Sequence, residues 1–371
     1  MRIAQVASSY YPRIGGVETH VSRLAQGFAQ AGDQVTILTH QFGNAQADEW
    51  DGKVRVLRFP LAISSRNYPI SLAMFRYLKR HAADFDVVHG HNYHSIVGHA
   101  AAGAPLPFVF TPHYNATGHT WFRTRLHRLY RGIGARQFAA ANAVICVSDA
   151  ERHVLIRDFP DAAAKMVTIP NGTDQRRPAA GDKLGRAERP VLLTVGRLER
   201  YKNVDLVIDA FRTLPNEATL VVVGDGPDRS RLERHVRAIG ASGPIHFTGR
   251  VPDPVLDDLF ARASVVTSAS DHEAFGLTLA EGLASGARVV ASAIPAHIDL
   301  ARRAGAGAAV ALVDPRDARQ FADALETSLR AGRVPAGDVT LPSWTEVVTD
   351  TRELYSRITA EGQSARARGA A

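Results

Sequence analysis

Short apolar runs alternate with longer amphipathic stretches along this chain, and no other feature of the sequence limits the fold as strongly. A parallel sheet buries its strands on both faces, so each strand is a brief apolar run and each crossover is a helix. In the stretch 17–31, for example, Val21, Leu24 and Phe28 share one helical face, and Gly32 follows as a stop signal. The pattern predicts an α/β fold built from doubly wound parallel sheets.

The expected elements form two series. The first contains candidate strands at 3–7, 35–39, 54–58, 87–89, 108–111, 143–147 and 166–169. The second contains candidate strands at 191–195, 220–223, 245–247, 265–268 and 288–291, with helices near 203–213, 228–239, 254–262 and 276–285.

The alternation stops near residue 172 and restarts near residue 190. The stretch 173–189 is polar and contains four Arg, two Gly and one Pro, which is typical of a linker. We therefore expect an N-terminal domain over 1–172 and a C-terminal domain over 190–342, each Rossmann-like. A final helix is predicted over 343–360, and the small, polar and basic residues 361–371 are expected to be disordered.

The composition fits a globular protein with two cores. The chain has 371 residues, of which 45% are hydrophobic and 22% are charged. Its net charge of +7 is modest, and no recognised nucleic-acid module is present, so we expect no nucleic-acid partner. Cys146, the only cysteine, excludes an internal disulfide and is expected to be a buried strand thiol.

Localisation is inferred from the apolar runs. None approaches the roughly 20 residues that a membrane helix needs. The first residues form a predicted strand and are too short and interrupted for a signal peptide. We expect a cytoplasmic protein, with peripheral association at the inner face of the membrane as the alternative. The oligomeric state is left open.

Two glycine-containing loops follow predicted strands. Gly15 and Gly16 lie just before the helix 17–31, where glycine lets backbone N–H groups approach an anion. A simple tight turn is the alternative. In the second half, Gly196 and Arg197 end a buried strand, and Lys202 lies near the start of the next helix. Together the two cations would neutralise a diphosphate without a metal ion; the alternative is two solvated surface residues.

The segment 268–281 is the most specific. A strand ends, a polar loop carries Glu273, and a helix opens at about Gly276, so that the free N–H groups of its first turn form a phosphate site. Glu281 lies five residues after Gly276, roughly 7–8 Å along the helix axis. That spacing suits a diphosphate at the helix start and a ribose diol at Glu281, with Glu273 facing a sugar.

The ordered set of motifs resembles the retaining glycosyltransferases called glycosyltransferase group 1, which have the GT-B fold of two Rossmann-like domains facing across a cleft. The resemblance covers nearly the whole chain, and its most specific element is the pair Glu273 and Glu281, the family's E-x7-E motif. The other matching segments are Gly15–Glu18, Thr111–His113, Val147-Ser148, Pro170–Gly172, Gly196-Arg197 with Lys202-Asn203, Gly224–Pro227 and Gly249–Val251.

The resemblance implies a role for each matching residue. Gly16 approaches the donor diphosphate, Arg197 and Lys202 hold it, and Glu273 binds hydroxyls of the donor sugar. Phe275, Gly276 and Leu277 supply backbone amides. Glu281 binds the ribose, and Val251 lies near the base. His113 contacts the transferred sugar, and the last helix crosses back onto the N-terminal domain.

The reaction implied is the transfer of a sugar, with retained anomeric configuration and no metal ion or cofactor, from a nucleotide-sugar donor to a hydroxyl acceptor. A UDP-sugar is favoured and a GDP-sugar is second. The acceptor is a glycan, a lipid-linked sugar or a small molecule. Three alternatives stay open: a sugar-nucleotide epimerase, a phosphorylase, and a non-catalytic nucleotide-sugar-binding subunit.

Two further segments have competing interpretations. His89, His91 and His94, in a histidine-rich region that continues to His119, are either metal ligands or polar residues that line the acceptor site. We favour the second and expect no metal. The basic amphipathic stretch 72–81 is either a helix lying on an anionic membrane or, as we favour, a domain helix with a solvated basic side.

Overall fold

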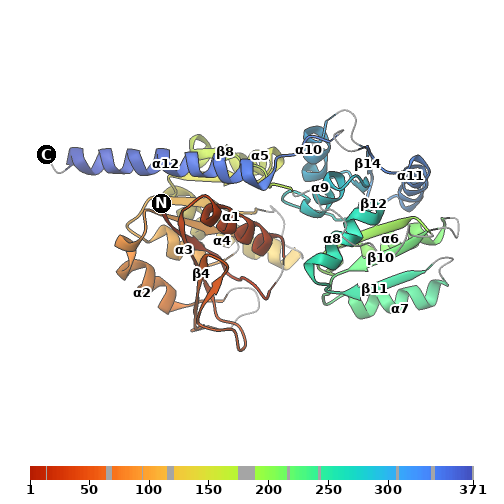
Figure 1. The fold of residues 1–371 in the computed structure, drawn as a ribbon, viewed down its shortest axis with the longest axis horizontal. Helices are drawn as coiled ribbons and strands as arrows, with labels where there is room; N and C mark the ends of the chain where they lie inside the picture. Colours follow the sequence, from red (N-terminus) through yellow and green to blue (C-terminus); the bar gives the residue numbers. More distant parts are fainter. Residues whose placement is uncertain are drawn as a thin grey trace. The chain divides into compact units, whose positions relative to one another are not determined.

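The chain forms two compact units, which the computed structural model divides into Met1–Gly172 with Pro342–Ala371, and Thr173–Leu341 (Figure 1). We call them unit 1 and unit 2. The structure describes residues 1–13, 15–63, 69–93, 95–114, 121–173, 189–214, 218–240, 244–305, 309–335 and 339–369, with the backbone alone over 121–130 and 363–369.

The sheet of unit 1 has the strand order β3-β4-β2-β1-β5-β6-β7-β8. Only the edge pair β3 and β4 is antiparallel; the other neighbours are parallel. The order reverses between β1 and β5, which makes this a doubly wound sheet. The strands are β1 (Arg2–Val6), β2 (Gln34–His40), β3 (Asp48–Asp51), β4 (Val54–Phe59), β5 (Val87–His91), β6 (Phe108–Thr111), β7 (Ala143–Cys146) and β8 (Met166–Thr168).

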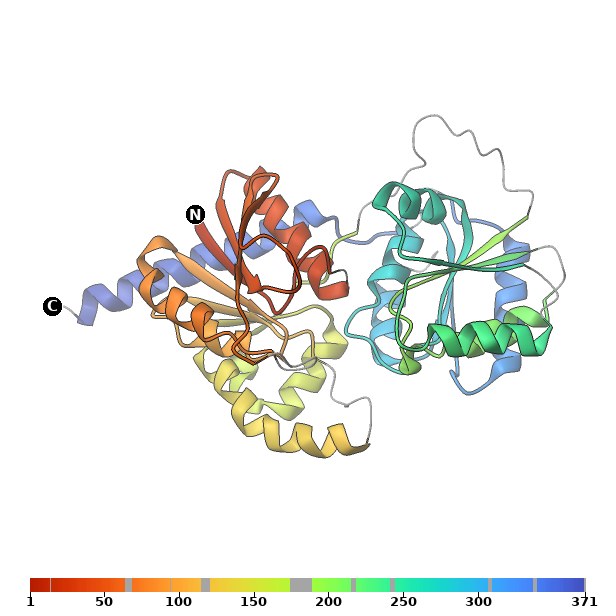
Figure 2. The same cartoon turned by 90° about the horizontal axis from the view of Figure 1, so that it is seen from below.

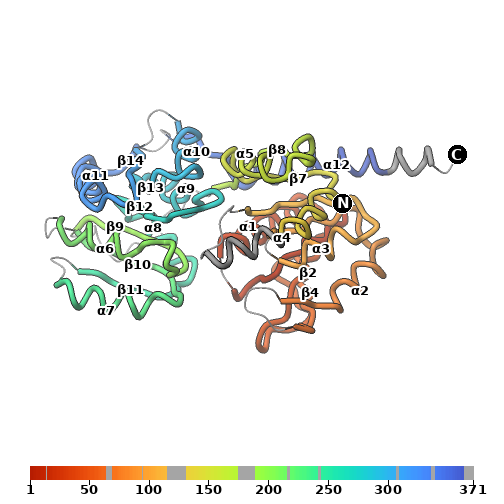
Figure 3. The backbone as a smooth tube through the Cα atoms, turned by 180° about the vertical axis from the view of Figure 1, so that it is seen from behind, coloured from red at the N-terminus to blue at the C-terminus, as the bar shows by residue number. Residues whose placement is uncertain are grey.

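Helices cover both faces of this sheet. Residues that alternate along β1 and β5 point to opposite faces: Ala4 and Val88 join a core with four helices, α2 (Leu72–Arg80), α3 (Val97–Ala102), α4 (Trp121–Ala140) and α5 (Asp149–Asp158). Figure 3 shows α5 beside β7 and β8. On the opposite side, α1 (Gly16–Gln30) packs along α12 (Trp344–Gly369), as Figures 1 and 2 show.

Helix α12 is an integral part of unit 1. A Cβ on Gly27 of α1 would lie only 2.4 Å from Cγ2 of Val348. Arg352 donates from Nε to Asp33 at 2.8 Å, and the buried Tyr355 hydroxyl lies 2.5 Å from His89 Nδ1. The last helix therefore packs on the N-terminal domain, as the resemblance implies.

Unit 2 contains a six-stranded parallel sheet in the order β11-β10-β9-β12-β13-β14. The helices α6 and α11 pack on one face, and α8 and α9 contact β12 on the other. The strands are β9 (Val191–Val195), β10 (Thr219–Val223), β11 (Ile245–Gly249), β12 (Ala263–Ser268), β13 (Arg288–Ser292) and β14 (Val310–Val313). The helices are α6 (Val204–Arg212), α7 (Arg229–Ile239), α8 (Asp253–Arg262), α9 (Leu277–Ala284), α10 (Pro295–Arg303) and α11 (Ala318–Ala331).

The structure differs from the predicted elements at three places. The edge strand β3 has the polar sequence DEWD, which carries no strand signal. The elements α10, β14 and α11 lie in 292–342, where the sequence predicted none. Helix α12 continues to Gly369, through most of the segment 361–371 that was expected to be disordered, because its Ala, Glu, Gln and Arg residues favour helix.

Two general expectations agree with the structure. Cys146 is a buried free thiol in β7, as predicted. In the part of the chain that the structure describes, no helix has the length and hydropathy needed to span a bilayer. Helix α2 buries Met74 and Leu78 in the core of unit 1, which favours a domain helix over one lying on a membrane.

Candidate active site

The geometry of a doubly wound sheet places the candidate ligand site of unit 2 at the carboxyl end of β9. The strand order reverses there, with β10 on one side and β12 on the other, and ligands of such sheets bind at this switch point. A small pocket lies at this position. It is lined by Thr194, Val195, Gly196, Arg197, Leu198, Lys202, Val204, Val223 and Ser268. The predicted diphosphate ligands Arg197 and Lys202 therefore line one pocket.

Glycines let the loops around this pocket pack backbone against backbone. A Cβ on Gly224 would lie 1.9 Å from the carbonyl oxygen of Gly196. One on Gly226 would lie 2.3 Å from the carbonyl oxygen of Leu198. Gly224 also has φ +125, which disfavours any residue with a side chain. The loop after β10 thus supports the loop that carries Arg197.

Lys202 and Glu273 form an ion pair across the switch point. Lys202 Nζ donates to Glu273 Oε1, and both side chains are 20% exposed. The Ser270 hydroxyl donates to the same carboxylate oxygen at 2.9 Å. Arg197, in contrast, pairs with its neighbour Glu199 and is 54% exposed.

The ion pair raises the pKa of Lys202 and lowers the pKa of Glu273. Burial alone would lower the pKa of Lys202, but the Glu273 carboxylate raises it above its ordinary value. Burial would raise the pKa of Glu273, yet the charge of Lys202 and the hydrogen bonds lower it. Both groups are consequently charged near neutral pH.

A second set of contacts holds the two loops together. Asn203 has the left-handed φ of +47. Its side-chain nitrogen Nδ2 donates to Ala269 O at 3.0 Å and to Asp271 Oδ1 at 2.8 Å. The Asp271 amide donates to Tyr201 O at 2.9 Å. The predicted motif Lys202-Asn203 is thus attached to the loop that carries Glu273.

The start of α9 lies directly after this loop. Gly276 is its N-cap at φ +93, and Leu277 is its first residue, as the sequence predicted within one position. No side chain among the described residues caps this end, so its first amides are available to an anion. Phe275 is buried beside it, and Glu281 is a buried residue of the same helix.

His297 is a site residue that sequence reasoning missed. It lies in α10 and is 1% exposed, with Nδ1 bound to Ser292 O at 2.9 Å. Its Nε2 is buried without a hydrogen-bond partner among the described residues. A Cβ on Gly276 would lie 3.2 Å from its ring. No local pattern marks His297; only the packing of α10 against the start of α9 brings it here. Val251 follows β11 at the same edge of the sheet.

The corresponding edge of unit 1 carries Gly15, Gly16 and His113. Gly15 is the N-cap of α1 and Gly16 its first residue, and a Cβ on Gly16 would meet no described atom within 4 Å. His113 follows β6 in the left-handed conformation, at φ +46, a backbone state that is rare outside glycine and often functional. The sequence marked all three residues.

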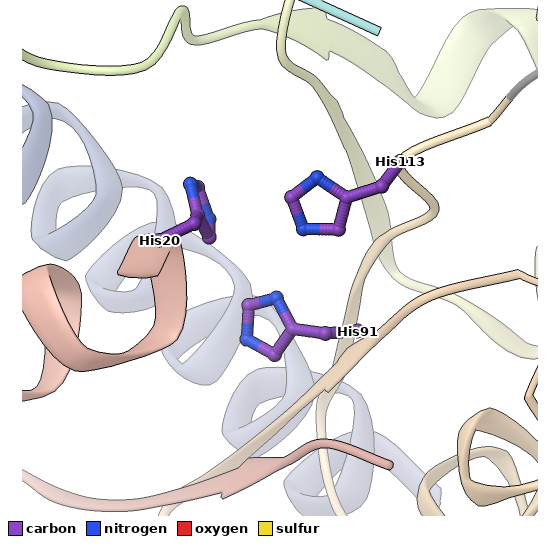
Figure 4. Close-up of side chains that lie close together, drawn as sticks. All are labelled: His20, His91 and His113. Carbon is purple, nitrogen blue, oxygen red and sulfur yellow. The ribbon is translucent and has the colours of Figure 1, made fainter. Parts of the chain in front are cut away.

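Histidines gather at this edge, in a grouping different from the one that the sequence suggested. His91, the last residue of β5, lies with His113 and with His20 of α1 (Figure 4). His89 points into the core toward Tyr355, and His94 and His119 are outside the described residues. Burial lowers the pKa of His20 to about 4 and lowers the pKa of His91 and His113 well below the ordinary value. His20 was not predicted.

A larger pocket in unit 1 lies at the opposite edge of the sheet. Its lining includes Arg2, Asp86 and Pro107, which precede or begin strands at their amino ends. Parallel sheets bind their ligands at the carboxyl ends. We therefore place the candidate active site at the carboxyl edges, and the larger pocket has no part in it.

Comparisons with known proteins identify the family. Residues 14–177 match the family described as Glycosyltransferase Family 4, and residues 177–334 match Glycosyl transferases group 1. The chain belongs to the glycosyltransferase group 1 family. Its activity is accordingly the transfer of a sugar from a nucleotide sugar, and its fold is GT-B.

Individual relatives of this group 1 glycosyltransferase match along nearly their whole length. It is 28% identical to a D-inositol 3-phosphate glycosyltransferase of Xylanimonas cellulosilytica, over 93% of this chain and 92% of that protein. The structure is similar to sucrose-phosphate synthase from Thermosynechococcus elongatus, with a TM-score of 0.76, 21% identity and coverage of 97% and 99%. It is also similar to HepE of Anabaena in complex with UDP-glucose, with a TM-score of 0.71, 19% identity and coverage of 98% and 100%.

Proposed function

We propose that this group 1 glycosyltransferase moves a sugar from a UDP-sugar to a hydroxyl acceptor with retention of the anomeric configuration. A GDP-sugar is the second choice of donor. The observation that carries the proposal is the Lys202–Glu273 ion pair at the switch point of unit 2, next to the uncapped start of α9. It supplies a cation for phosphate and a carboxylate for sugar hydroxyls within one hydrogen bond of each other.

The donor is proposed to replace the ion pair with contacts of its own. Lys202 and Arg197 bind the diphosphate together with the amides of Phe275, Gly276 and Leu277. Glu273 accepts hydrogen bonds from the transferred sugar, Glu281 from the ribose, and Val251 lies near the base. Gly196 allows the diphosphate to approach the backbone. Because two side-chain cations and a helix start balance the leaving charge, no metal ion is needed for the transfer.

Residues of unit 1 are assigned by the family resemblance. Gly15 and Gly16 offer backbone amides to the diphosphate, and His113 contacts the transferred sugar. For the acceptor we propose a glycan, a lipid-linked sugar or a small polyol phosphate. The relative from Xylanimonas cellulosilytica, whose name gives D-inositol 3-phosphate, supports the last of these. The complex of HepE with UDP-glucose supports the uridine donor.

The first test is thermal stabilisation of the protein by nucleotides and nucleotide sugars in the absence of divalent metal ions. A ligand that binds only the folded protein stabilises it, and the stabilisation grows with the logarithm of the ligand concentration divided by Kd. We expect UDP and a UDP-sugar to raise the melting temperature, and GDP to raise it less. The absence of a shift with every nucleoside diphosphate would contradict the proposal.

The second test follows the product. With the donor that stabilises best, nuclear magnetic resonance of the product formed on an inositol phosphate or oligosaccharide acceptor reports the anomeric configuration. Retention is expected, and inversion would contradict the mechanism. Conversion of the donor alone to an epimer would favour the epimerase alternative.

Two variants test the assigned roles by steady-state kinetics. Arg197→Ala should lower turnover by orders of magnitude, whereas Glu281→Ala should raise the KM for the donor more than it lowers kcat.

A further inference from the structure

Three imidazole rings from three different elements of unit 1 enclose a common point. His20 comes from α1, His91 from the end of β5 and His113 from the segment after β6. Figure 4 shows their rings turned toward one another. The ring centroids are 5.5 Å apart for His20 and His91, 4.8 Å for His20 and His113, and 5.9 Å for His91 and His113. One nitrogen of each ring lies within 4.8 Å of the other two.

Each of these rings has one buried nitrogen without a hydrogen-bond partner among the described residues. The three atoms are His20 Nε2, His91 Nδ1 and His113 Nε2. Leaving a buried polar atom unpaired costs about 1–3 kcal/mol. Three such atoms in one place therefore indicate a binding partner that satisfies all of them at once.

Neighbouring amides fix which nitrogen carries the proton in two of the rings. Asn171 Oδ1 lies 2.7 Å from His20 Nδ1, and Gln5 Oε1 lies 2.5 Å from His91 Nε2. The Gln5 side chain is itself oriented, because its nitrogen donates to the Tyr355 hydroxyl at 3.2 Å. An amide oxygen only accepts hydrogen bonds, so the facing ring nitrogens are protonated.

The remaining nitrogens of His20 and His91 therefore present lone pairs to the common point. Such lone pairs repel an anion, and a single water molecule would use both of its protons on these two rings. A cation interacts favourably with every lone pair. Histidine that donates from one nitrogen to a side-chain or backbone oxygen and ligates through the other is the usual arrangement at protein metal sites.

We propose that His20, His91 and His113 bind a divalent transition-metal ion, with Zn²⁺ as the preferred physiological ion. Imidazole nitrogen suits Zn²⁺, whereas Mg²⁺ and Ca²⁺ prefer oxygen ligands. A zinc–nitrogen bond of about 2.0–2.1 Å in a tetrahedral site places ring centroids about 5 Å apart, close to the observed spacings. Three protein ligands leave the fourth position to water or to an oxygen of a bound molecule.

The proposed site goes beyond the transferase activity and does not rest on it, since its test needs neither donor nor acceptor. It also differs from the metal site considered for His89, His91 and His94. His89 has both ring nitrogens paired, with the Tyr355 hydroxyl at 2.5 Å and the Thr111 hydroxyl at 2.7 Å. The ligand that the local sequence pattern lacks is His20 of α1, whose ring lies against the rings of His91 and His113.

Metal binding is measured on the full chain without a histidine tag, after removal of bound metal by a chelator. Equilibrium dialysis with Zn²⁺ is expected to give one tightly bound ion per chain. Titration with Co²⁺ is expected to produce the intense visible absorption of a tetrahedral nitrogen-ligated ion. Mg²⁺ should bind at least about a hundredfold more weakly, because the site offers it no oxygen ligand.

Three variants and a matched control assign the site. His20→Gln, His91→Gln and His113→Gln should each weaken Zn²⁺ binding by more than the 10–100-fold that loss of a supporting hydrogen bond typically causes. His89→Gln is the control, because His89 is equally buried in the same strand but has no unpaired ring nitrogen. It should weaken Zn²⁺ binding by less than about tenfold, the lower end of the loss that a supporting residue typically causes.

Two outcomes would overturn the proposal. One is a wild-type protein that binds no more Zn²⁺ than the His20→Gln variant, and the other is a His89→Gln variant that loses as much affinity as the three ligand variants. If a ligand variant fails to fold, the Co²⁺ spectrum of the wild type decides. Weak absorption of the octahedral type would then contradict a site made of three imidazoles.

Discussion

Lys202 and Glu273 are placed so that each determines the charge of the other. Both side chains are largely withdrawn from water, and each would be expensive to keep ionised alone. Their pairing, with the Ser270 hydroxyl as a third member, keeps them charged and oriented. A phosphate that binds Lys202 and a sugar hydroxyl that binds Glu273 would substitute for this pair without reorganising either side chain.

Lys202→Met tests this arrangement at one residue. It removes a cation from the proposed diphosphate site and leaves the Glu273 carboxylate unpaired. We expect kcat to fall by about 10²–10³ and the free energy of unfolding to fall by about 1–3 kcal/mol. The matched control is Lys53→Met, at an exposed lysine of unit 1. Steady-state kinetics and denaturant titration measure both effects, and a variant with normal turnover would contradict the assignment of Lys202.

The ion pair also predicts a pH dependence of stability. The folded-state pKa of Glu273 is below its ordinary value of 4.5, so the unfolded chain takes up a proton first as the pH falls. The contribution of the pair to stability is thus complete above about pH 4.5 and is lost as the pH falls through the folded-state pKa.

The measurement compares the wild type with Glu273→Gln, which does not titrate. The difference in their free energies of unfolding should be constant between about pH 5 and pH 8 and should decrease below pH 4.5. A difference that grows on acidification would show that the folded-state pKa of Glu273 is raised instead. Denaturant unfolding followed by circular dichroism at each pH provides the values.

At the residue scale, the site residues that could be predicted from the sequence are those in loops that directly follow strands. Gly196, Lys202, Glu273 and Gly276 follow strand ends, and the carboxyl edge of a parallel sheet gathers such loops. His20 and His297 could not be predicted in the same way. Both lie within helices, and only tertiary packing determines which neighbouring element their rings face.

The start of α9 is the element on which the proposed donor site depends most. Its N-cap, Gly276, has φ +93, a conformation that costs a residue with a Cβ roughly 1–2 kcal/mol. An alanine Cβ here would also press on the buried ring of His297, 3.2 Å away. Glycine therefore reaches this geometry without the strain that a side chain would add.

Gly276→Ala should lower the free energy of unfolding by about 1–3 kcal/mol and weaken the binding of the nucleoside diphosphate. Gly240→Ala is the control, since Gly240 ends α7 at φ +57 and its Cβ would meet no described atom within 4 Å. It should lose stability but bind the diphosphate normally. Isothermal titration calorimetry with UDP measures the affinity of each variant. Equal loss of affinity in both variants would contradict a specific role for the start of α9.

Element boundaries were predictable where apolar runs are bounded by turn residues. The strands at Phe108–Thr111 and Val191–Val195 have the predicted limits. Helix α11 was overlooked, although Asp317 caps it and Phe321 and Leu325 form its buried face. The edge strand β3 could not be predicted in this way. Its residues are polar, and it forms through backbone pairing with β4.

At the scale of the whole molecule, the chain returns to unit 1 after completing unit 2. Gly27, in the last turn of α1, lies against Val348 of α12 with no room for a Cβ between them. The polar contacts of Arg352 with Asp33 and of Tyr355 with His89 lie further along the same helix. The N-terminal domain is therefore built from two segments separated by the whole of unit 2.

Gly27→Ala is expected to displace α12. The added Cβ would lie 2.4 Å from Val348 Cγ2, and overpacking of this kind costs about 1–3 kcal/mol. Gly132→Ala is the matched control, because Gly132 also lies in a helix but its Cβ would meet no described atom within 4 Å. The control should be neutral or slightly more stable.

Limited proteolysis and thermal unfolding measure both variants. Faster cleavage within Trp344–Gly369 is expected only in Gly27→Ala. Equal cleavage in the two variants would mean that α12 adjusts to the extra methyl group without leaving α1.

The two-segment construction of unit 1 also determines an order of events during synthesis. Residues Thr173–Leu341 emerge from the ribosome before the helix that completes the first unit. Unit 2 has all of its sheet and helices at that moment, whereas unit 1 still lacks α12, the partner of α1. Domains usually fold in the order in which they are made. Here unit 1 is begun first and completed last, and the surface of α1 that packs on α12 stays exposed until α12 has been translated.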